Sequence, residues 1–238
     1  MTPADKLPYP CVVFDLDGTL LDTGQAMMDA INTLVDELGR PAIAVDRIGN
    51  ATHQGLSAML HAALKATGPL PTPTMLQQLE CLLRERYLAT AASTVRCFAG
   101  ARELLDLLSA RGAWLAVCSN QDENSVRKLL AIFGLLGYFS EIVGGDTLPK
   151  RKPDPMPLHW LMNAAGCARG SMLMVGDSEV DAECAERSGI TMVLMGHGYG
   201  GNTVNNPHLA VPDFSSLLQL LLPRSARRDL SKNSTVQS

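Results

Sequence analysis

Short apolar runs alternate with longer segments of helical periodicity along most of this chain. The runs predict buried strands at Cys11–Phe14, Trp114–Cys118, Glu141–Val143, Met172–Val175 and Thr191–Met195. Between and after them, apolar residues recur three and four positions apart, which predicts helices at Ala101–Arg111, Asn124–Gly134, Pro155–Ala165, Val180–Ser188 and Phe214–Leu222. Strands that alternate with helices predict an α/β core in which a parallel sheet carries helices on both faces.

The segment from residue 23 to residue 97 breaks this alternation because it has helical character throughout. It predicts three helices, joined by turns rich in proline and glycine, at Gln25–Leu38, Gln54–Lys65 and Thr74–Ala91. We interpret residues 23–97 as a helical cap domain inserted after the first strand. Residues 1–22 and 98–223 would then form a Rossmann-like catalytic core of three layers. Residues 224–238 are polar and basic without apolar periodicity and predict a disordered tail.

Composition narrows the class of protein. The chain has 238 residues and a formal net charge of −4, which argues against a nucleic-acid partner because such proteins usually carry a basic surface. No apolar run has the length of a membrane span, and the N-terminus does not read as a signal peptide. The scattered cysteines, without a Cys-x-x-Cys pair, predict reduced thiols in a cytoplasmic protein: Cys11, Cys81, Cys97, Cys118, Cys167 and Cys184.

The end of the first predicted strand carries two carboxylates. Asp15 and Asp17 follow the apolar run, and Gly18 and Thr19 then turn the chain. Residues two apart in a strand point to the same side, so these anions repel each other unless a cation lies between them. Mg²⁺ is the usual cation for carboxylates that act on phosphorylated substrates. An acidic solvated turn is the alternative, but Asp-x-Asp-Gly-Thr after a buried strand favours chemistry.

Reactive groups follow three more predicted elements. Ser119 and Asn120 end the second strand, where a hydroxyl and free backbone N–H groups either bind a phosphate or cap a helix. Lys152 precedes a proline, which fixes the backbone so that its ammonium is aimed. Asp177 and Asp181 follow the fourth strand one helical turn apart, either as part of a site or as acids at a helix N-terminus.

These motifs, taken in order, resemble the haloacid dehalogenase-like hydrolase superfamily over about residues 9–222. The matching residues are Asp15-x-Asp17-Gly18-Thr19, Ser119-Asn120, Lys152-Pro153 and Gly176-Asp177-x-x-x-Asp181. Within the superfamily, several stretches are similar to phosphoglycolate phosphatases, namely Ile48-Gly49-Asn50, Gly144-Gly145-Asp146-Thr147-Leu148-Pro149 and Gly198-Tyr199-Gly200. The cap departs from that pattern after Asn50.

The resemblance implies a role for each motif residue. Asp15 is the expected nucleophile and a Mg²⁺ ligand, which would form an aspartyl-phosphate. Asp17 is the expected acid and base, and its backbone carbonyl would reach the metal. Asp177 would complete the metal ligands, and Asp181 would orient them. The expected phosphate-binding groups are those of Ser119, Asn120 and Lys152.

The cap is expected to choose the substrate. Arg47, Asn50, Thr52 and His53 lie near the joint of the first two predicted cap helices. An arginine there would bind a substrate carboxylate in a fork geometry, or would simply face solvent. The five histidines show no metal-ligand spacing and are expected to be structural or exposed.

The sequence therefore predicts a Mg²⁺-dependent phosphatase that hydrolyses a small phosphorylated metabolite, phosphoglycolate first. Two alternatives share the core, a sugar-phosphate phosphatase and a phosphosugar mutase. A receiver-like signalling module also has a phospho-accepting aspartate, Mg²⁺ and a lysine, but such modules are much shorter than 238 residues. Asp17 favours phosphate esters over halides, because a halide leaving group needs no proton.

Overall fold

The computed structural model describes residues 7–200, 204 and 208–222, and its centre is a parallel six-stranded sheet. The spatial order is β5-β4-β1-β6-β7-β8. The bounds are β1 Cys11–Phe14, β4 Trp114–Cys118, β5 Glu141–Val143, β6 Met172–Gly176, β7 Thr191–Met195 and β8 Leu209–Val211. The predicted α/β class is confirmed. The strand β8 was not predicted: it has only three residues, and they are partly buried or exposed.

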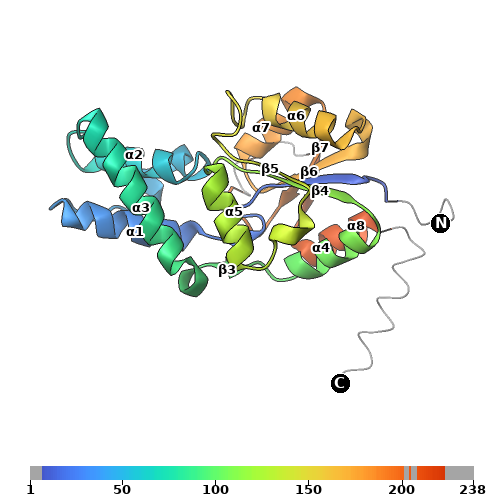
Figure 1. The fold of residues 1–238 in the computed structure, drawn as a ribbon, viewed down its shortest axis with the longest axis horizontal. Helices are drawn as coiled ribbons and strands as arrows, with labels where there is room; N and C mark the ends of the chain where they lie inside the picture. Colours follow the sequence, from blue (N-terminus) through green and yellow to red (C-terminus); the bar gives the residue numbers. More distant parts are fainter. Residues whose placement is uncertain (1–6, 201–203, 205–207, 223–238) are drawn as a thin grey trace, which may run out of the picture.

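Helices cover both faces of the sheet (Figure 1). One face carries α4 Ala101–Ala110, α5 Glu123–Ile132 and α8 Phe214–Leu221, and the other carries α6 Met156–Ala165 and α7 Glu179–Ser188. Side chains in β1 alternate between these layers: Val12 and Phe14 belong to one buried cluster, and Cys11 and Val13 to the other. The strands β1, β4, β6 and β7 are buried on both sides, which is why each has a continuous apolar sequence.

The strand order reverses at β1. From β1 the chain builds outward to β4 and β5, then crosses back to place β6 on the other side of β1. The registers align the strand ends, because Phe14 of β1 pairs with Val117 of β4 and with Val175 of β6. The motifs that follow β1, β4 and β6 therefore meet at one edge of the sheet, where open parallel sheets bind ligands.

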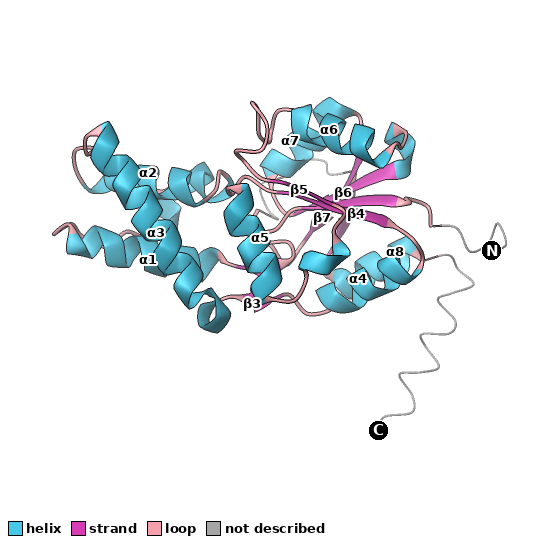
Figure 2. Cartoon of the chain, viewed as in Figure 1, coloured by secondary structure: helices cyan, strands magenta, loops and turns pink. Residues whose placement is uncertain are grey.

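A helical layer lies to one side of the sheet and contains α1 Gly24–Glu37, α2 Leu56–Thr67 and α3 Pro73–Thr94 (Figures 1 and 2). We refer to residues 23–97 as the cap segment. Two short 3₁₀ helices, η2 Val45–Arg47 and η3 Gly49–His53, join α1 to α2. The strands β2 Leu21–Asp22 and β3 Arg96–Cys97 pair antiparallel, so the chain enters and leaves the segment side by side. The remaining 3₁₀ helices are η4 Leu136–Tyr138 and η5 Arg169–Ser171.

Helix boundaries follow ordinary capping chemistry. The Thr72 hydroxyl accepts a hydrogen bond from the backbone N–H of Met75, and Pro73 begins α3. At the other end of the chain, α6 and α7 finish at Gly166 and Gly189, whose φ angles of 60° and 66° are left-handed. Only glycine adopts this conformation at no steric cost, so these sequence signals for helix ends are confirmed.

All six cysteines are free thiols. Cys11, Cys118 and Cys184 are buried, whereas Cys97 and Cys167 are partly buried and Cys81 is exposed. The expected tail, residues 224–238, lies outside the described residues. None of the helices that the structure describes is both long and apolar enough to cross a membrane.

The packing of the cap segment generates a stability prediction. Leu60 in α2 is completely buried, so Leu60→Ala is expected to leave a cavity and lower the free energy of unfolding by about 2–5 kcal/mol. Leu70, in the turn before α3, is 43% exposed, so Leu70→Ala should change it by less than about 0.5 kcal/mol. Urea denaturation of both variants measures the difference, and equal small effects would contradict a packed interior in this segment.

Candidate active site

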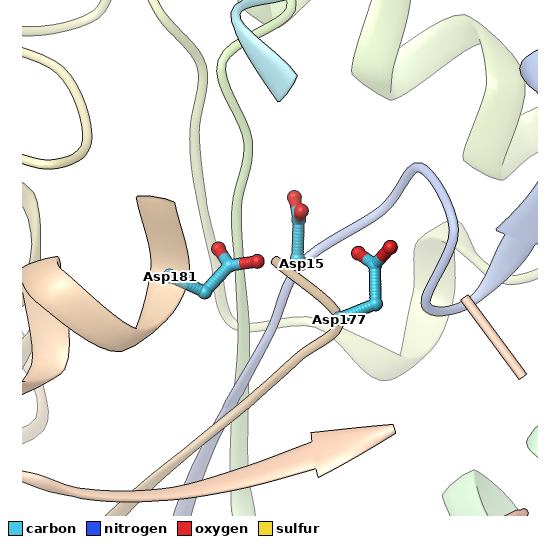
Figure 3. Close-up of side chains that lie close together, drawn as sticks. All are labelled: Asp15, Asp177 and Asp181. Atoms are coloured by element: carbon cyan, nitrogen blue, oxygen red, sulfur yellow. The ribbon is translucent and has the colours of Figure 1, made fainter. Parts of the chain in front are cut away.

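Three aspartates converge at the edge of the sheet where β1 and β6 end (Figure 3). Asp15 follows β1, Asp177 follows β6, and Asp181 lies in the first turn of α7. One carboxylate oxygen from each lies within 4.8 Å of the others, and all three side chains are buried. A backbone hydrogen bond of 2.8 Å from the N–H of Asp15 to the carbonyl of Val175 fixes the spacing of the two strand ends.

Lys152 supplies the positive charge of this cluster. Its ammonium lies 2.9 Å from Oδ1 of Asp15 and 2.6 Å from Oδ1 of Asp181, and its side chain is 2% exposed. Burial alone would lower the pKa of Lys152, but the two carboxylates raise it well above its ordinary value. The lysine is therefore charged and holds Asp15 and Asp181 together.

The hydrogen bonds separate the three aspartates into two kinds. Both oxygens of Asp181 are used, one by Lys152 and the other by the hydroxyl of Ser178 at 2.6 Å and its N–H at 3.2 Å. Oδ2 of Asp15 accepts no hydrogen bond within the described part of the chain. Asp177 accepts from the N–H of Tyr199 at 2.7 Å and, at 3.3 Å, from the hydroxyl of Thr19. Oδ2 of Asp15 is therefore open to a cation. Each oxygen of Asp177 accepts one hydrogen bond from a neutral donor and keeps a second lone pair, whereas Asp181 is bound to the Lys152 ammonium and twice to Ser178.

The chemistry of the donor set fits a divalent metal ion. All its ligand atoms are carboxylate oxygens, which hard cations prefer. Three carboxylates against one ammonium leave two negative charges in a buried cluster. Burial and the charge of Asp181 raise the pKa of Asp15 well above its ordinary value, although Lys152 opposes the shift. The same two causes raise the pKa of Asp177 to about 7. A divalent cation would relieve this repulsion.

Two glycines make room for Asp177. Gly18 has a φ of 77°, and a Cβ there would lie 2.4 Å from Oδ2 of Asp177. A Cβ on Gly198 would lie 2.1 Å from the Cβ of the same aspartate. Heavy atoms that are not bonded cannot approach so closely, so any side chain at either position would displace the carboxylate.

Asp17 is held apart from this cluster by neutral donors. The side-chain amide of Gln121 lies 2.7 Å from each of its carboxylate oxygens, and the hydroxyl of Thr23 lies 2.7 Å from Oδ1. Burial raises the pKa of Asp17, although both donors oppose the shift. Burial and the charge of Asp17 raise the pKa of Tyr87, in α3. Asp17 is therefore oriented by residues from the core and the cap segment together.

The expected phosphate-binding residues lie directly after β4 and in the loop that contains Lys152, and a hydrogen bond connects these two segments. Ser119 is 2% exposed, and its hydroxyl accepts a hydrogen bond of 3.1 Å from the backbone N–H of Gln121. The amide of Asn120 donates to the carbonyl of Lys152 at 3.1 Å and to that of His53 at 3.0 Å. Asn120 thereby connects the lysine loop with the cap segment.

A pocket of about 820 Å³ lies between the core and the cap segment. Asp17 is part of its wall, as are Asn50, Thr52 and His53. Burial lowers the pKa of His53. The pocket thus brings three of the four expected cap residues towards the site.

Arg47 is not among the residues that line this pocket, and its side chain is exposed. Its neighbours Val45 and Asp46 occupy the pocket wall instead. The geometry of the short helix η2 determines which of its side chains line the pocket, and the sequence pattern alone did not show that Arg47 is excluded. The exposed position of Arg47 favours the alternative of a solvent-facing arginine, and a fork between Arg47 and a substrate carboxylate stays a prediction.

Tyr199 connects the aspartate cluster with the cap segment. No role was predicted for this residue from the sequence. Its hydroxyl accepts from the N–H groups of Thr23 at 2.6 Å and Gly24 at 2.7 Å, and it donates to Asp22 at 2.8 Å. Its own N–H binds Asp177. The stretch Gly198-Tyr199-Gly200 was a signal, because two glycines flanking an aromatic residue mark a tight approach of backbone to neighbours.

Gln121 was also missed. It directly follows Ser119 and Asn120, so proximity to a motif was the available signal. A glutamine after a strand has no specific chemistry of its own, and only the fold shows that its amide reaches Asp17.

The other histidines are structural or exposed, as expected. The Nε2 atom of His197 lies 3.1 Å from the carbonyl of Thr19, and its ring stacks on Phe98 with centroids 4.1 Å apart. His61 is exposed. The Nδ1 atom of His208 accepts a hydrogen bond of 3.3 Å from the N–H of Met192.

A parallel sheet whose strand ends carry a buried cluster of carboxylates, beside a helical segment, is the arrangement expected of an aspartate-dependent phosphohydrolase. A family model described as haloacid dehalogenase-like hydrolase matches residues 12–195. The chain belongs to this family, so the resemblance seen in the sequence is confirmed and a receiver-like module is not supported.

Curated relatives agree with this assignment. A phosphoglycolate phosphatase of Cereibacter sphaeroides is 35% identical over 216 residues, which cover 90% of this chain and 98% of that protein. A phosphoglycolate phosphatase of Pseudomonas syringae pv. syringae is 33% identical over 247 aligned positions, covering 98% of this chain and 89% of the relative. The predicted enzyme class, a phosphoric monoester hydrolase, is confirmed.

Solved structures share the fold. The crystal structure of a protein from Haemophilus somnus, described as a predicted phosphoglycolate phosphatase, has a TM-score of 0.80 and 27% identity. The match covers 90% of this chain and 98% of that one. The order of strands and the helical segment beside the sheet are therefore shared by a relative of known structure.

The raised pKa of Asp177 predicts how stability depends on pH when metal is removed. Its ordinary value is 3.8 and its value in the folded protein is about 7, so the folded state binds this proton more tightly than the unfolded chain. The stabilisation is complete below pH of about 4 and is lost as the pH rises through about 7, a change on the order of 4 kcal/mol.

Urea unfolding in excess chelator at several pH values measures this loss. Asp177→Asn, which cannot titrate, should make the slope shallower, whereas Asp36→Asn on the exposed face of α1 should retain it. An unchanged slope in Asp177→Asn would show that other groups dominate.

Proposed function

We propose that this protein is a Mg²⁺-dependent phosphatase that hydrolyses a small phosphomonoester through an aspartyl-phosphate on Asp15. The observation that carries the proposal is the buried cluster in which Lys152 contacts Asp15 and Asp181 beside Asp177. A pocket large enough for an organic leaving group opens next to it at Asp17. We further propose that residues 23–97 act as the cap domain and that the enzyme is cytoplasmic, which six free thiols support.

Asp15 and Asp177 are the proposed carboxylate ligands of Mg²⁺, together with the backbone carbonyl of Asp17. When bound, the cation neutralises charge on the oxygens of the transferring phosphoryl group. Asp181 is a positioning residue, because one of its oxygens binds the Lys152 ammonium and the other accepts two hydrogen bonds from Ser178. The proposed phosphate-binding groups are the Lys152 ammonium, the Ser119 hydroxyl and the Asn120 amide, which surround the end of β4.

In the first step, a carboxylate oxygen of Asp15 attacks phosphorus and the bond from phosphorus to the alcohol oxygen breaks. Asp17 gives its proton to that oxygen, so the alcohol leaves uncharged. Burial raises the pKa of Asp17, which favours the protonated form that this step needs. Gln121 and Thr23 keep the carboxyl at the mouth of the pocket.

In the second step, the same Asp17 takes a proton from water, and the water oxygen attacks phosphorus. The bond between phosphorus and Asp15 breaks, which releases inorganic phosphate and restores the carboxylate. Covalent catalysis thus divides one slow hydrolysis into two phosphoryl transfers, in which Asp17 serves first as the acid and then as the base.

The natural substrate is open to direct test. Phosphoglycolate comes first because the relatives carry it in their names. Sugar phosphates are a second candidate, which the pocket volume of about 820 Å³ favours, since glycolate would fill only a small part of it. Release of inorganic phosphate from a panel of both kinds of ester, with Mg²⁺ present, tests the proposal.

Asp15→Asn is expected to lower turnover by roughly 10³-fold or more, because the amide is no nucleophile and contributes no charge to the metal site. The fold should be retained, since the side chain keeps its shape. Phosphate release and circular dichroism measure the two outcomes. Asp36→Asn, the same change on an exposed helix face, is the control, and near wild-type turnover by Asp15→Asn would overturn the mechanism.

Excess chelator is expected to abolish activity, and Mg²⁺ to restore it. Ca²⁺ should inhibit, because it accepts more ligands at longer distances and would engage both oxygens of Asp15. Steady-state phosphate release with each cation measures the effect. Full activity in chelator would exclude a metal-dependent reaction.

A further inference from the structure

The pocket at Asp17 has a mostly apolar lining that also contains polar side chains. Its apolar side chains come from α1, η2, α2 and α7, namely Met27, Met28, Val45, Met59 and Val180. A leaving group in this space would be in contact with flexible thioether side chains, which adapt to irregular shapes. This wall favours an organic group with hydrocarbon surface over a small fully charged one.

The ionisable groups of the wall are acidic. Carboxylates line the pocket at five positions, Asp17, Asp22, Asp46, Glu179 and Glu183. No lysine or arginine belongs to the wall among the residues that the structure describes. The single histidine there, His53, has a pKa lowered by its burial and so stays neutral near pH 7.

The nearby cations are already engaged or point elsewhere. The ammonium of Lys152 contacts Asp15 and Asp181. Arg187 pairs with Glu183, one of the carboxylates of the wall, and donates to the carbonyl of Pro153 at 3.4 Å. Arg151 donates to the carbonyl of Gln54 at 3.2 Å. The charge of a bound phosphate is met by the lysine and the proposed Mg²⁺, so the described wall of this pocket offers no further cation to a second anionic group of the substrate.

Part of the acidic wall is free to accept hydrogen bonds. Asp22 accepts from Tyr199, and Glu183 from Arg187. Asp46 and Glu179, in contrast, accept no hydrogen bond from any residue in the described ranges. Carboxylates only accept, so their complementary partners are hydroxyl and amide donors. An additional carboxylate on the substrate would face repulsion and would stay unpaired.

Resting on the proposed phosphatase activity, we infer that this pocket selects phosphomonoesters whose leaving alcohol is uncharged and carries hydroxyl or amide donors. Esters with a carboxylate on the leaving group, phosphoglycolate included, are the disfavoured class. The chain would then differ in preference from the curated relatives that carry the name phosphoglycolate phosphatase.

A matched pair of substrates tests the inference. Phosphoglycolate and its carboxamide, 2-phosphoglycolamide, have nearly the same size and differ in one negative charge. With Mg²⁺ present, kcat/KM for the amide is expected to exceed that for the acid by roughly tenfold or more. A preference for phosphoglycolate would overturn the inference and leave the proposed function intact. Failure to release phosphate from either ester, and from aryl and sugar phosphates, would instead overturn the proposed function.

Substitutions in the pocket wall test which carboxylates disfavour a charged leaving group. Glu179→Gln and Asp46→Asn should each raise kcat/KM for phosphoglycolate relative to the amide by roughly threefold to tenfold, because each removes a repelling charge. Glu186→Gln is the control, since Glu186 is exposed on the same helix as Glu179 and does not line the pocket. Equal ratios in all three variants would contradict the inference. A fall in kcat/KM for phosphoglycolate relative to the amide in Arg47→Ala would also contradict the inference, because it would show that this arginine binds the substrate carboxylate.

Discussion

The ion pairs of one buried lysine hold the centre of this molecule together. Lys152 lies 2.9 Å from Asp15 and 2.6 Å from Asp181, in a cluster that also contains Asp177. Buried carboxylates without a partner would lose most of their hydration and repel one another. The surrounding sequence follows from this constraint: two glycines make space for Asp177, and a capping serine occupies the second oxygen of Asp181.

The sequence was sufficient to predict which residues lie together where they directly follow parallel strands. Asp15, Ser119 and Asp177 each follow an apolar run, and parallel strands bring such ends together whatever the connections between them. It was insufficient where a contact depends on how separate elements pack. The amide of Gln121 and the hydroxyl of Tyr199 have ordinary side-chain chemistry, and only the tertiary fold places them on Asp17 and on the start of α1.

The same distinction explains the cap segment. Helical periodicity predicted three helices there and the structure has them, because periodicity reports burial. The orientation of Arg47 depends on the geometry of a three-residue 3₁₀ helix, which has too few residues to show a period. The strands β2 and β3 were not predicted because each spans only two residues. The strand β5 was predicted although it has three residues, since two of them are buried, whereas no residue of the three-residue strand β8 is buried.

The short helices η2 and η3 contain no buried residue, although both contribute to the pocket wall. Substitutions on exposed positions usually change stability very little. Mutations in this part of the pocket wall therefore cost little stability and are weakly opposed by selection for folding. Mutations in the buried carboxylate cluster would cost stability as well as activity. Descendants of one ancestral enzyme can diverge in what they hydrolyse while the reaction itself stays constant, and overall sequence identity is then a poor guide to substrate.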